Sequence, residues 1–494
     1  MARPLNVLFL SSEVEPFVKT GGLADVSSAL PQTIKQLGHE IRIMMPSYGS
    51  INQRTAKLHE ITRLRDIAVT LGNRPYRASV KSSFMGEGAS RLQVYFLDNP
   101  ELFGRSGLYV DPSTLQDYHD NDDRFFFFCR GVLEVLKTLG WQPDIIHCND
   151  WQTGLVPAYL KTIYNNDPFY DNIRTVFTIH NMAYQGVFPI SSFNKTSLPQ
   201  ELLSENGLVA YGNINLLKAG LLFADALTTV SERYAQEIQC SAEFGYGLQG
   251  VVSMRKNDLV GIINGIDYSV WDPAVDERIP HHYDSKSLDS KLENKKALLA
   301  SVGLPFDESV PLIGMISRLA DQKGLDIIGA ILDQMMGMAL QFVVLGTGER
   351  RYHDMLERAR RAFPDKMAIY LGFNNELAHL VEAGSDMFLM PSRYEPCGLN
   401  QMYSLAYGTV PIVRATGGLD DTIEPVDPSS GTGTGFKFTN YDSGELLWTI
   451  QHAVHLFADK TLWRQVMKNG MSKDFSWESS AKKYVHLYRS ILKN

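Results

Sequence analysis

The sequence predicts an α/β protein made of two doubly wound domains, each with a parallel sheet covered by helices on both faces. Three observations lead to this prediction. Short, continuously apolar runs alternate with amphipathic stretches of helical spacing. The alternation occurs in two separate series, and a polar stretch without any strand pattern separates them. The chain has 494 residues, which is enough for two or three domains.

The first series opens with a βαβ unit. Leu5–Leu10 (LNVLFL) is apolar throughout, as expected for a strand that is buried on both faces. The segment DVSSALPQTIKQLGHE has apolar residues at helical spacing and ends at Gly38, and Pro31 is expected early enough in this helix to be tolerated. Ile41–Met45 is the next strand. Further strands are expected at Gln93–Leu97, Asp144–Cys148, Thr175–His180, Ala226–Val230 and Val260–Ile263.

The second series begins after the polar stretch that starts INGIDYSVWDP. We place the domain boundary near Asn264–Pro273, because polar clusters replace the apolar runs there. Strands are then expected at Pro311–Ile316, Phe342–Leu345, Met367–Leu371, Met387–Met390 and Val410–Val413.

Composition excludes several classes of protein. Hydrophobic residues make up 44% and charged residues 21%, as in soluble globular proteins, and the formal charge of −8 argues against a broad surface for nucleic acid. Neither a signal-peptide pattern nor an apolar run long enough to span a membrane is present. The four cysteines lack ligand spacing, which is typical of a reducing compartment. We therefore expect a cytoplasmic protein that binds neither nucleic acid nor membrane.

Two nearly identical hexapeptides occur near opposite ends of the chain. Thr20–Asp25 reads TGGLAD and Thr416–Asp421 reads TGGLDD. Each follows an apolar strand and precedes a helical stretch. Ligands of open parallel sheets bind outside the carboxyl ends of the strands, where such loops lie. We therefore expect one copy in each domain, with both lining a common cleft; the alternative is a coincidence of two short glycine turns.

Basic residues next to such loops indicate where a phosphate group would bind. The first copy reads KTGGLAD and adds Lys19. A stronger candidate is MISRLADQKGLD, where Arg318 and Lys323 flank a short loop that leads into a helix. Two fixed cations beside a helix start match the charge of a diphosphate. The alternative is a solvated pair of surface cations.

Other phosphate and metal motifs are absent or weak. The sequence contains no GxxxxGK[ST] motif, and Gly346–Gly348 is a lone GxG that lacks the third glycine of a dinucleotide fingerprint, so a dehydrogenase is disfavoured. Asp120–Asp122 (DND) has the form of a metal-binding DxD. It is expected in a polar loop, DYHDNDDR, without a partner ligand, where a hydrogen-bonded turn is the more ordinary structure.

Several longer motifs together resemble the bacterial glycogen synthase and plant starch synthase family. They are KTGGLADV, HNMAYQG, SRLADQKGLD, PSRYEPCGLNQMYSLAYGTVPIVRATGGLDDTI and the terminal DFSWESSAKKYVHLYRSIL, and they cover essentially the whole chain. The resemblance implies a GT-B fold, in which two Rossmann-like domains face each other across a deep cleft. Residues 1–263 would form the acceptor side and 264–473 the donor side. A C-terminal helix of about residues 474–494 would pack back on the first domain.

The resemblance also implies an activity. The family transfers glucose from a nucleotide-sugar donor, here expected to be ADP-glucose, to the non-reducing-end 4-OH of an α-1,4-glucan. The anomeric configuration is retained, ADP is released, and no metal or redox cofactor takes part. Two alternatives stay open, UDP-glucose as the preferred donor and a catalytically silent glucan-binding protein. The sucrose synthase group is disfavoured, because the second glutamate of its E-x7-E motif is here Tyr403.

Matching motifs assign the residues that would act in catalysis. Arg318 and Lys323 would hold the departing diphosphate, and Glu395 would lie near the glucosyl hydroxyls. Asp150 (in NDWQTG) and His180 would lie beside the reacting sugar. A histidine at the end of a strand is otherwise an ordinary structural residue.

The remaining matches would bind substrate: Lys19, Gly22, Asp25, Asn264, Phe373, Cys397, Gly398, Leu399 and Asn400. Phe373 would stack on the base, although it could be a core residue. Cys397 is expected to be a packed thiol without a nucleophilic role. Two positions depart from the family pattern, since Asn400 replaces a common threonine and Phe373 replaces a common tyrosine. Loss of the tyrosine hydroxyl leaves stacking possible.

Overall fold

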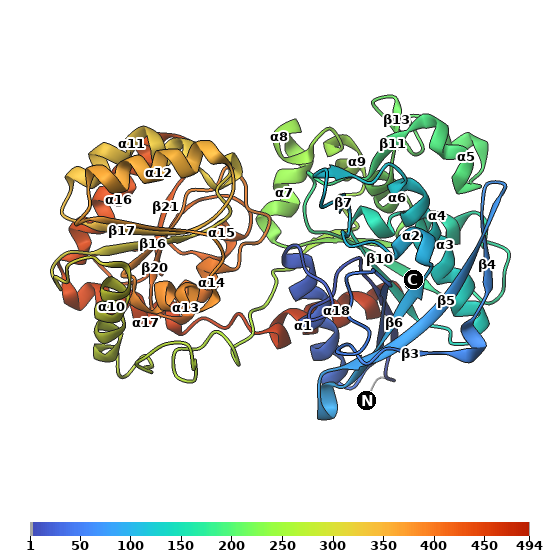
Figure 1. Ribbon diagram of the computed structural model, residues 1–494, viewed down its shortest axis with the longest axis horizontal. Coiled ribbons are helices and arrows are strands. Elements are labelled where there is room, and N and C mark those ends of the chain that lie inside the picture. The colour runs from blue at the N-terminus through green and yellow to red at the C-terminus, as the bar shows by residue number, and fades with distance from the viewer. Residues whose placement is uncertain (1–2, 494) are drawn as a thin grey trace. The chain divides into compact units, whose positions relative to one another are not determined.

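The computed structural model describes residues 3–493, with the side chain of Ala89 excepted, and divides into two compact units. The first unit comprises the described residues of Met1–Val230, Ala235–Ile262 and Trp477–Asn494, and the second comprises Ser231–Tyr234 and Ile263–Ser476. Each unit contains its own central sheet (Figure 1). No helix in the described part of the chain is both long and apolar enough to cross a bilayer.

Within the described residues, the first unit has a ten-stranded sheet whose centre is parallel. In spatial order its strands are β15 (Leu259–Gly261), β14 (Ala226–Thr229), β10 (Arg174–Ile179), β9 (Ile145–Asn149), β1 (Asn6–Leu10), β2 (Glu40–Pro46), β6 (Leu92–Asp98), β5 (Arg74–Met85) and β3 (His59–Glu60), and β4 (Ile67–Leu71) pairs with β5. The parallel strands confirm the expected series to within one or two residues at each end.

The antiparallel edge, β3 to β5, was missing from the sequence prediction. Its strands face solvent on one side, so β5 alternates exposed and buried residues in place of a continuous apolar run. Two small antiparallel sheets complete the unit: β11 (Val187–Pro189) with β13 (Asn213–Asn215) and β12 (Val209–Ala210), and β7 (Val110–Asp111) with β8 (Gln116–Asp117).

The helices of the first unit pack around this sheet, and α18 comes from the far end of the sequence. The helices are α1 (Gly22–Gln36), α2 (Pro100–Phe103), α3 (Asn121–Leu139), α4 (Leu155–Lys161), α5 (Phe193–Thr196), α6 (Leu216–Phe223), most of α7 (Glu232–Cys240), α8 (Ala242–Gly245), α9 (Gln249–Met254) and α18 (Trp477–Ile491). In Figure 1, α18 lies beside α1. A buried hydrogen bond of 2.7 Å between Tyr488 Oη and His147 Nδ1 ties α18 to β9.

One prediction about α1 was wrong. Pro31 was expected early in the helix, but α1 begins at Gly22, so the proline lies in its interior. The glycine loop is therefore shorter than expected and leads directly into the helix. Pro31 lacks the N–H that would bond to the carbonyl of Ser27, and a proline ring in this position favours a bend.

The second unit has a six-stranded sheet, all parallel, among the described residues. Its spatial order is β18 (Met367–Leu371), β17 (Gln341–Gly346), β16 (Leu312–Ile316), β19 (Met387–Met390), β20 (Val410–Arg414) and β21 (Phe436–Phe438). The helices are α10 (Asp289–Val302), α11 (Leu325–Gly337), α12 (Arg350–Ala362), α13 (Asn375–Gly384), α14 (Asn400–Ala406), α15 (Gly417–Thr422), α16 (Ser443–Phe457) and α17 (Lys460–Met471).

Alternate residues of these strands belong to two separate hydrophobic clusters. Phe342 and Val344 pack in the cluster that includes α11 and α12, whereas Val343 packs in the cluster that includes α10 and α13. In Figure 1 these pairs of helices lie on opposite faces of the sheet. Both faces of the sheet are covered at its central strands, which explains why runs such as Phe342–Leu345 are apolar without alternation.

Candidate active site

The predicted polar residues gather where the strand order of each sheet reverses. In the first unit the chain runs outward from β1 through β2 to β6, and then returns to start again at β9 on the other side of β1. In the second unit the same reversal separates β16 from β19. Crevices beyond the carboxyl ends of strands at such a switch point are the usual ligand sites of open parallel sheets.

Asp150 and His180 lie together at this edge of the first unit, directly after β9 and β10. Asp150 is 9% exposed, and its Oδ1 accepts the backbone N–H of His180 at 2.8 Å. The imidazole Nε2 of His180 lies 2.9 Å from Asn149 Oδ1. Asp150 has φ +55° and ψ −179°, a conformation that is strained for any residue other than glycine. Such strain concentrates at functional sites.

Burial changes the charge of both side chains. Desolvation lowers the pKa of His180 to about 4, so the imidazole is neutral near pH 7. The pKa of Asp150 is raised to about 7, mainly by desolvation and also by the negative charge of Glu13, against hydrogen bonds from the backbone of His180 and Asn181. An aspartate that is half ionised at neutral pH, beside a neutral histidine, is a typical feature of a catalytic site.

The first glycine loop lies next to β1 and opens helix α1. Gly21 is the N-cap and Gly22 the first helical residue. A Cβ atom added at either glycine would meet nothing within 4 Å, so the backbone there is open to an incoming group. Lys19 Nζ lies 2.6 Å from Asp25 Oδ1, and both side chains are at least one-third exposed. These three predicted residues, Lys19, Gly22 and Asp25, therefore form one group at the start of α1.

Glu13 holds this loop in place and was missed by the sequence analysis. Its carboxylate is 4% exposed and accepts the N–H and Oγ1–H of Thr20 at 2.5 and 2.6 Å, the N–H of Gly21 at 3.3 Å and the hydroxyl of Tyr109 at 2.7 Å. Only its position, seven residues before Thr20 on the same strand-to-helix connection, could have suggested this role. Because it also acts on Asp150, Glu13 links the loop to the strained aspartate.

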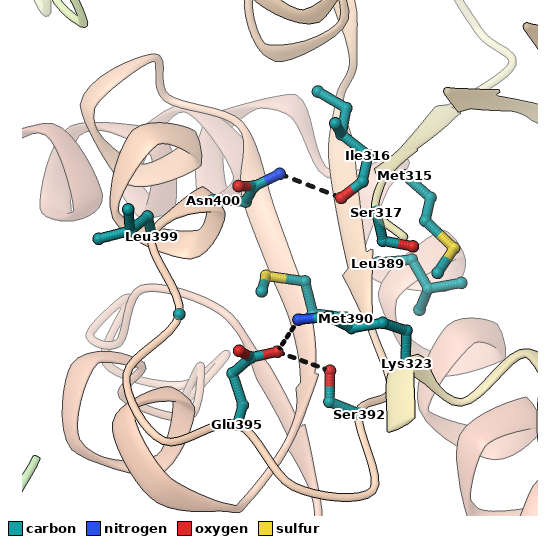
Figure 2. A pocket seen from close by; sticks show the side chains of 11 residues that line it. Met315, Ile316, Ser317, Lys323, Leu389, Met390, Ser392, Glu395, Leu399 and Asn400 are labelled. Carbon is teal, nitrogen blue, oxygen red and sulfur yellow. Dashed lines mark hydrogen bonds and ion pairs between the residues drawn. The ribbon is translucent and has the colours of Figure 1, made fainter. Parts of the chain in front are cut away.

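In the second unit a pocket lies between the ends of β16 and β19. Lys323 Nζ is 2.6 Å from Glu395 Oε2, and Ser392 Oγ donates a hydrogen bond of 3.1 Å to the same oxygen (Figure 2). The side chains of Lys323 and Glu395 are 21% and 8% exposed, so the ion pair is largely desolvated. Pocket walls also come from Ile316, Ser317, Gly398, Leu399 and Asn400. Lys323, Glu395 and this loop thus lie in one pocket of the second unit.

The loop Cys397–Leu399 borders this pocket through Gly398 and Leu399. Gly398 has φ +71°, and α14 begins at Asn400, so the first N–H groups of the helix have no acceptor within it. Asn400 Nδ2 donates to the carbonyl of Ile316 at 3.1 Å and so ties the loop to β16 (Figure 2). This bond gives the departure from the family's threonine a structural role. Burial raises the pKa of Cys397 to about 12, which leaves an inert thiol.

Three other predicted residues lie outside the walls of this pocket. Arg318 is exposed, and its guanidinium donates to Gln322 Oε1 at 3.1 Å. Phe373 is 88% exposed after β18, which excludes the alternative of a core residue. Asn264 is 6% exposed, its Oδ1 is buried without a partner among the described residues, and it contacts the Cys397 thiol.

The second glycine hexapeptide has a different role from the first. A Cβ at Gly417 would lie 2.0 Å from the carbonyl oxygen of Glu395, and one at Gly418 would lie 1.9 Å from that of Cys397. The N–H of Gly418 also donates to Glu395 at 3.1 Å. These glycines are therefore required by the close approach of two loops. The second copy supports the loop that carries Glu395, whereas the first copy is open.

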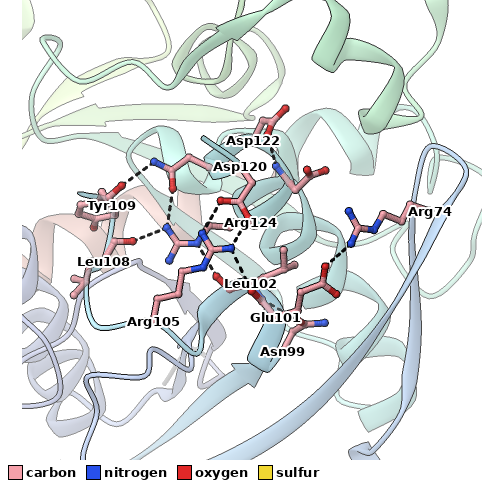
Figure 3. Close-up of polar contacts among 12 residues, drawn as sticks. Arg74, Asn99, Glu101, Leu102, Arg105, Leu108, Tyr109, Asp120, Asp122 and Arg124 are labelled. Carbon is pink, nitrogen blue, oxygen red and sulfur yellow. Dashed lines mark hydrogen bonds and ion pairs between the residues drawn. The ribbon is translucent and has the colours of Figure 1, made fainter. Parts of the chain in front are cut away.

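Asp120–Asp122 proves to be structural, and one part of the prediction was wrong: α3 already begins at Asn121, so the motif is not confined to a loop. Asp120 forms a bidentate ion pair with Arg105 at 2.5 and 2.6 Å (Figure 3), and Asp122 pairs with Lys195 at 2.7 Å. Asn121 accepts from the buried Arg124 at 2.7 Å. Asp120 and Asp122 are each paired with a cation, and Lys195 is shared with Asp123. No cluster of three metal-ligating side chains exists in the part of the chain described.

Comparison with known proteins agrees with this arrangement. Residues 6–254 match the starch synthase catalytic domain family and residues 300–461 match glycosyl transferases group 1. The catalytic domain of starch synthase IV from Arabidopsis thaliana, whose structure contains ADP and acarbose, is 32% identical, with a TM-score of 0.88 and full coverage of both chains. Two sheets with parallel centres and polar switch points, together with this likeness, define a glycosyltransferase of the GT-B fold.

Similarity to curated bacterial proteins is higher still. A glycogen synthase of Koribacter versatilis is 47% identical over 484 residues, which cover 98% of each chain. A glycogen synthase of Moorella thermoacetica is 45% identical over 493 residues, covering 100% of this chain and 98% of that one. The chain belongs to the glycogen synthase family, and the resemblance stated from its motifs is confirmed.

Proposed function

We propose that the protein transfers glucose from ADP-glucose to the non-reducing-end 4-OH of an α-1,4-glucan, with retention of configuration and release of ADP. The observation that carries the proposal is the largely desolvated Lys323–Glu395 pair, which lies in one pocket with Gly398, Leu399 and Asn400 at the switch point of the second sheet. A fixed cation and free backbone N–H groups suit a diphosphate that gains charge as it leaves. The likeness to a starch synthase domain that contains ADP supports adenine in the donor.

The residues of each unit have separate roles in this proposal. In the second unit, Lys323, Arg318 and the loop Cys397–Asn400 hold the diphosphate, and Glu395 accepts hydrogen bonds from glucosyl hydroxyls. Phe373 stacks on the base, for which its exposed ring is suited. Arg318 is exposed and its guanidinium is bonded to the neutral amide of Gln322, so the side chain can move to the donor.

In the first unit, Asp150 and His180 contact the reacting sugar, and Lys19, Gly22 and Asp25 form the adjoining loop. The bond from the anomeric carbon to the phosphate oxygen breaks, and a bond to the acceptor O4 forms on the same face. The acceptor hydroxyl gives its proton to the departing phosphate oxygen. Neutral His180 adds no positive charge beside the oxocarbenium-like sugar, whereas ionised Asp150 stabilises that sugar.

We place the protein in the cytoplasm. All four cysteines are free thiols, and three of them, Cys129, Cys148 and Cys397, are buried. A chain that leaves all its thiols unpaired is typical of a reducing compartment.

Donor use tests the proposal directly. Incorporation of labelled glucose into glycogen should be measured with ADP-glucose and UDP-glucose in parallel, with EDTA present. We expect at least about tenfold higher kcat/KM for ADP-glucose, which corresponds to about 1.4 kcal/mol of discrimination. Preference for UDP-glucose would overturn the donor assignment alone. Absence of transfer from either donor, with glycogen still bound, would favour a silent glucan-binding protein.

Glu13→Gln should act on the first loop without touching the donor pocket of the second unit. The carboxylate accepts the hydroxyls of Thr20 and Tyr109 with one oxygen and the N–H groups of Thr20 and Gly21 with the other. The amide has a single oxygen, so one of these two pairs of donors loses its acceptor, the loop loosens, and kcat/KM is expected to fall about tenfold. Removing the Glu13 charge should also lower the pKa of Asp150 and shift the acid side of the pH–rate profile to lower pH.

Hydrogen exchange of residues 19–25 measures the loosening independently of activity. Glu87→Gln is a matched control, because Glu87 is an exposed glutamate of the same unit. An unchanged profile and unchanged exchange in Glu13→Gln would contradict the assigned role.

A further inference from the structure

Three tyrosines on the first unit expose their rings to solvent although aromatic side chains are normally buried. Tyr184, Tyr211 and Tyr246 are 54%, 77% and 37% exposed. Tyr184 lies in the loop that follows His180, Tyr211 in the turn between β12 and β13, and Tyr246 directly after α8. None of them belongs to the sites described above, so their exposure requires a separate explanation.

Direct contacts join these three segments into one surface. The ring of Tyr211 lies against the backbone of Gly247, where an added Cβ would be 2.6 Å from ring atoms, and its hydroxyl donates to the Gly247 carbonyl at 3.3 Å. Gln185 Nε2 donates to the carbonyl of Tyr246 at 3.0 Å, and Asn215 Nδ2 donates to Gln185 Oε1 at 2.7 Å. Gln185 thus ties the loop of Tyr184 to Tyr246, and β13, which follows Tyr211, is tied to the same amide.

The backbone holds two of these rings at an energetic cost. Tyr211 has φ +52° and Tyr246 has φ +48°, a left-handed conformation that is uncommon for a bulky residue. Each stands immediately before a glycine, Gly212 or Gly247, that also has positive φ. Glycine or asparagine would fit these two turns with less strain. Strain of this kind persists where the surrounding structure imposes it, and it clusters at ligand sites.

The surface is also connected to the catalytic residues. Gly186 packs on the indole of Trp151, the residue after Asp150, so closely that a Cβ would be 2.3 Å from the ring. The loop from His180 to Gly186 therefore begins beside Asp150 and ends against Trp151, the next residue in the chain. A chain whose end lies at Asp150 and His180 can continue along this loop towards Tyr184.

We propose that Tyr184, Tyr211 and Tyr246 form a stacking surface that binds the α-glucan acceptor beyond its reacting glucose. An exposed phenol ring presents an apolar face and a polar edge, and a glucose unit presents an apolar C–H face ringed by hydroxyls. The groups that hold the three segments, the amides of Gln185 and Asn215 and the carbonyl of Gly247, are uncharged, which suits a neutral polyol. This inference rests on the proposed function, since it assigns the position of that function's acceptor.

Substitution of Tyr211 by asparagine tests the surface, because asparagine removes the ring and tolerates positive φ. We expect Tyr211→Asn to raise KM for glycogen about tenfold and to leave KM for ADP-glucose within twofold. In native gels that contain glycogen, the variant should be retarded less than the wild type. Tyr211→Phe, which retains the ring, should stay within about twofold of the wild type. Tyr184→Ala should reproduce the effect on KM for glycogen.

Phe84→Ala is the matched control, because Phe84 is 52% exposed on β5 of the same unit. Wild-type KM for glycogen in Tyr211→Asn and Tyr184→Ala, or an equal effect in Phe84→Ala, would overturn the inference. A parallel rise in both KM values with a lower Tm would also overturn it, since that pattern indicates a structural role. If the wild type transfers no glucose, the proposed function fails, and the gel assay still decides whether these tyrosines bind glucan.

Discussion

Lys323→Ala is expected to lower kcat for glucose transfer by about a hundred- to a thousandfold. The ammonium group is held 2.6 Å from Glu395 beside the loop Gly398–Asn400, where we place the leaving diphosphate. Its attraction to that group grows as the bond to glucose breaks, so the loss falls on kcat more than on KM for the donor. Initial rates over a range of ADP-glucose concentrations measure both constants.

Loss of fold must be separated from loss of catalysis in this variant. Lys323→Ala leaves the carboxylate of Glu395, 8% exposed, without its cation, and an unpaired buried charge is destabilising by roughly 3–5 kcal/mol. The double variant Lys323→Ala with Glu395→Gln removes that charge and should restore much of the Tm while remaining inactive. Lys296→Ala breaks an exposed pair with Glu293 on α10 and should leave kcat unchanged.

A kcat for Lys323→Ala within threefold of the wild type, in a folded protein, would show that this lysine does not assist departure of the diphosphate.

Asp150→Asn is expected to stabilise the protein at alkaline pH and to impair it as an enzyme. The folded-state pKa of Asp150 is about 7, above its ordinary value of 3.8. Between these two pH values the unfolded chain has lost the proton and the folded protein keeps it, so the folded state becomes less stable as pH rises. Above pH 7 the full loss of folding free energy from the buried, ionised carboxylate is present, on the order of 4 kcal/mol. Asparagine keeps an acceptor for the N–H of His180 and carries no charge.

Urea unfolding of both proteins at pH 4 and pH 8 measures this effect. The variant should be close to the wild type at pH 4 and more stable at pH 8. Asp167→Asn is a control of opposite sign, because Lys137 lowers the pKa of Asp167 and its carboxylate is favourable in the folded state. A stability difference for Asp150→Asn that is the same at both pH values would show that burial does not raise the pKa of Asp150.

Activity should require the ionised form of Asp150, whereas stability is higher with the protonated form. If ionised Asp150 stabilises the oxocarbenium-like sugar, kcat/KM of the wild type falls about tenfold for each pH unit below 7. His180 does not set this limb, because its pKa of about 4 lies well below that of Asp150. Asp150→Asn should lower kcat/KM about a hundredfold at pH 8 and remove the limb. A variant that retains both the rate and the limb would exclude the carboxylate from the reaction.

The strands and the family were predictable because short apolar runs and contiguous motifs indicate them. Runs such as Phe342–Leu345 are apolar at every position, since the sheet of the second unit is covered on both faces at this central strand. The edge strands β4 and β5 were missed, because one of their faces is exposed and their apolar residues are dispersed. Lys323 and Glu395 lie 72 positions apart, yet their motifs placed both at the end of a parallel strand, where neighbouring strands brought them into contact.

Tertiary structure alone decided what similar sequences do. TGGLAD and TGGLDD are almost identical, but their glycines have different surroundings. A Cβ at Gly22 would meet open space, whereas the backbone of Cys397 occupies the space beside Gly418. The first glycine therefore leaves room for a ligand, and the second leaves room for another part of the chain. Glu13 carries no motif, and only the folded loop shows that its carboxylate binds Thr20 and Tyr109. The sequence by itself determined the two sheets, the family and the residues at the strand ends, since apolar periodicity and contiguous motifs are local properties. The raised pKa of Asp150 depends on burial and on the charge of Glu13, 137 residues away, and such long-range effects exist only in the folded protein.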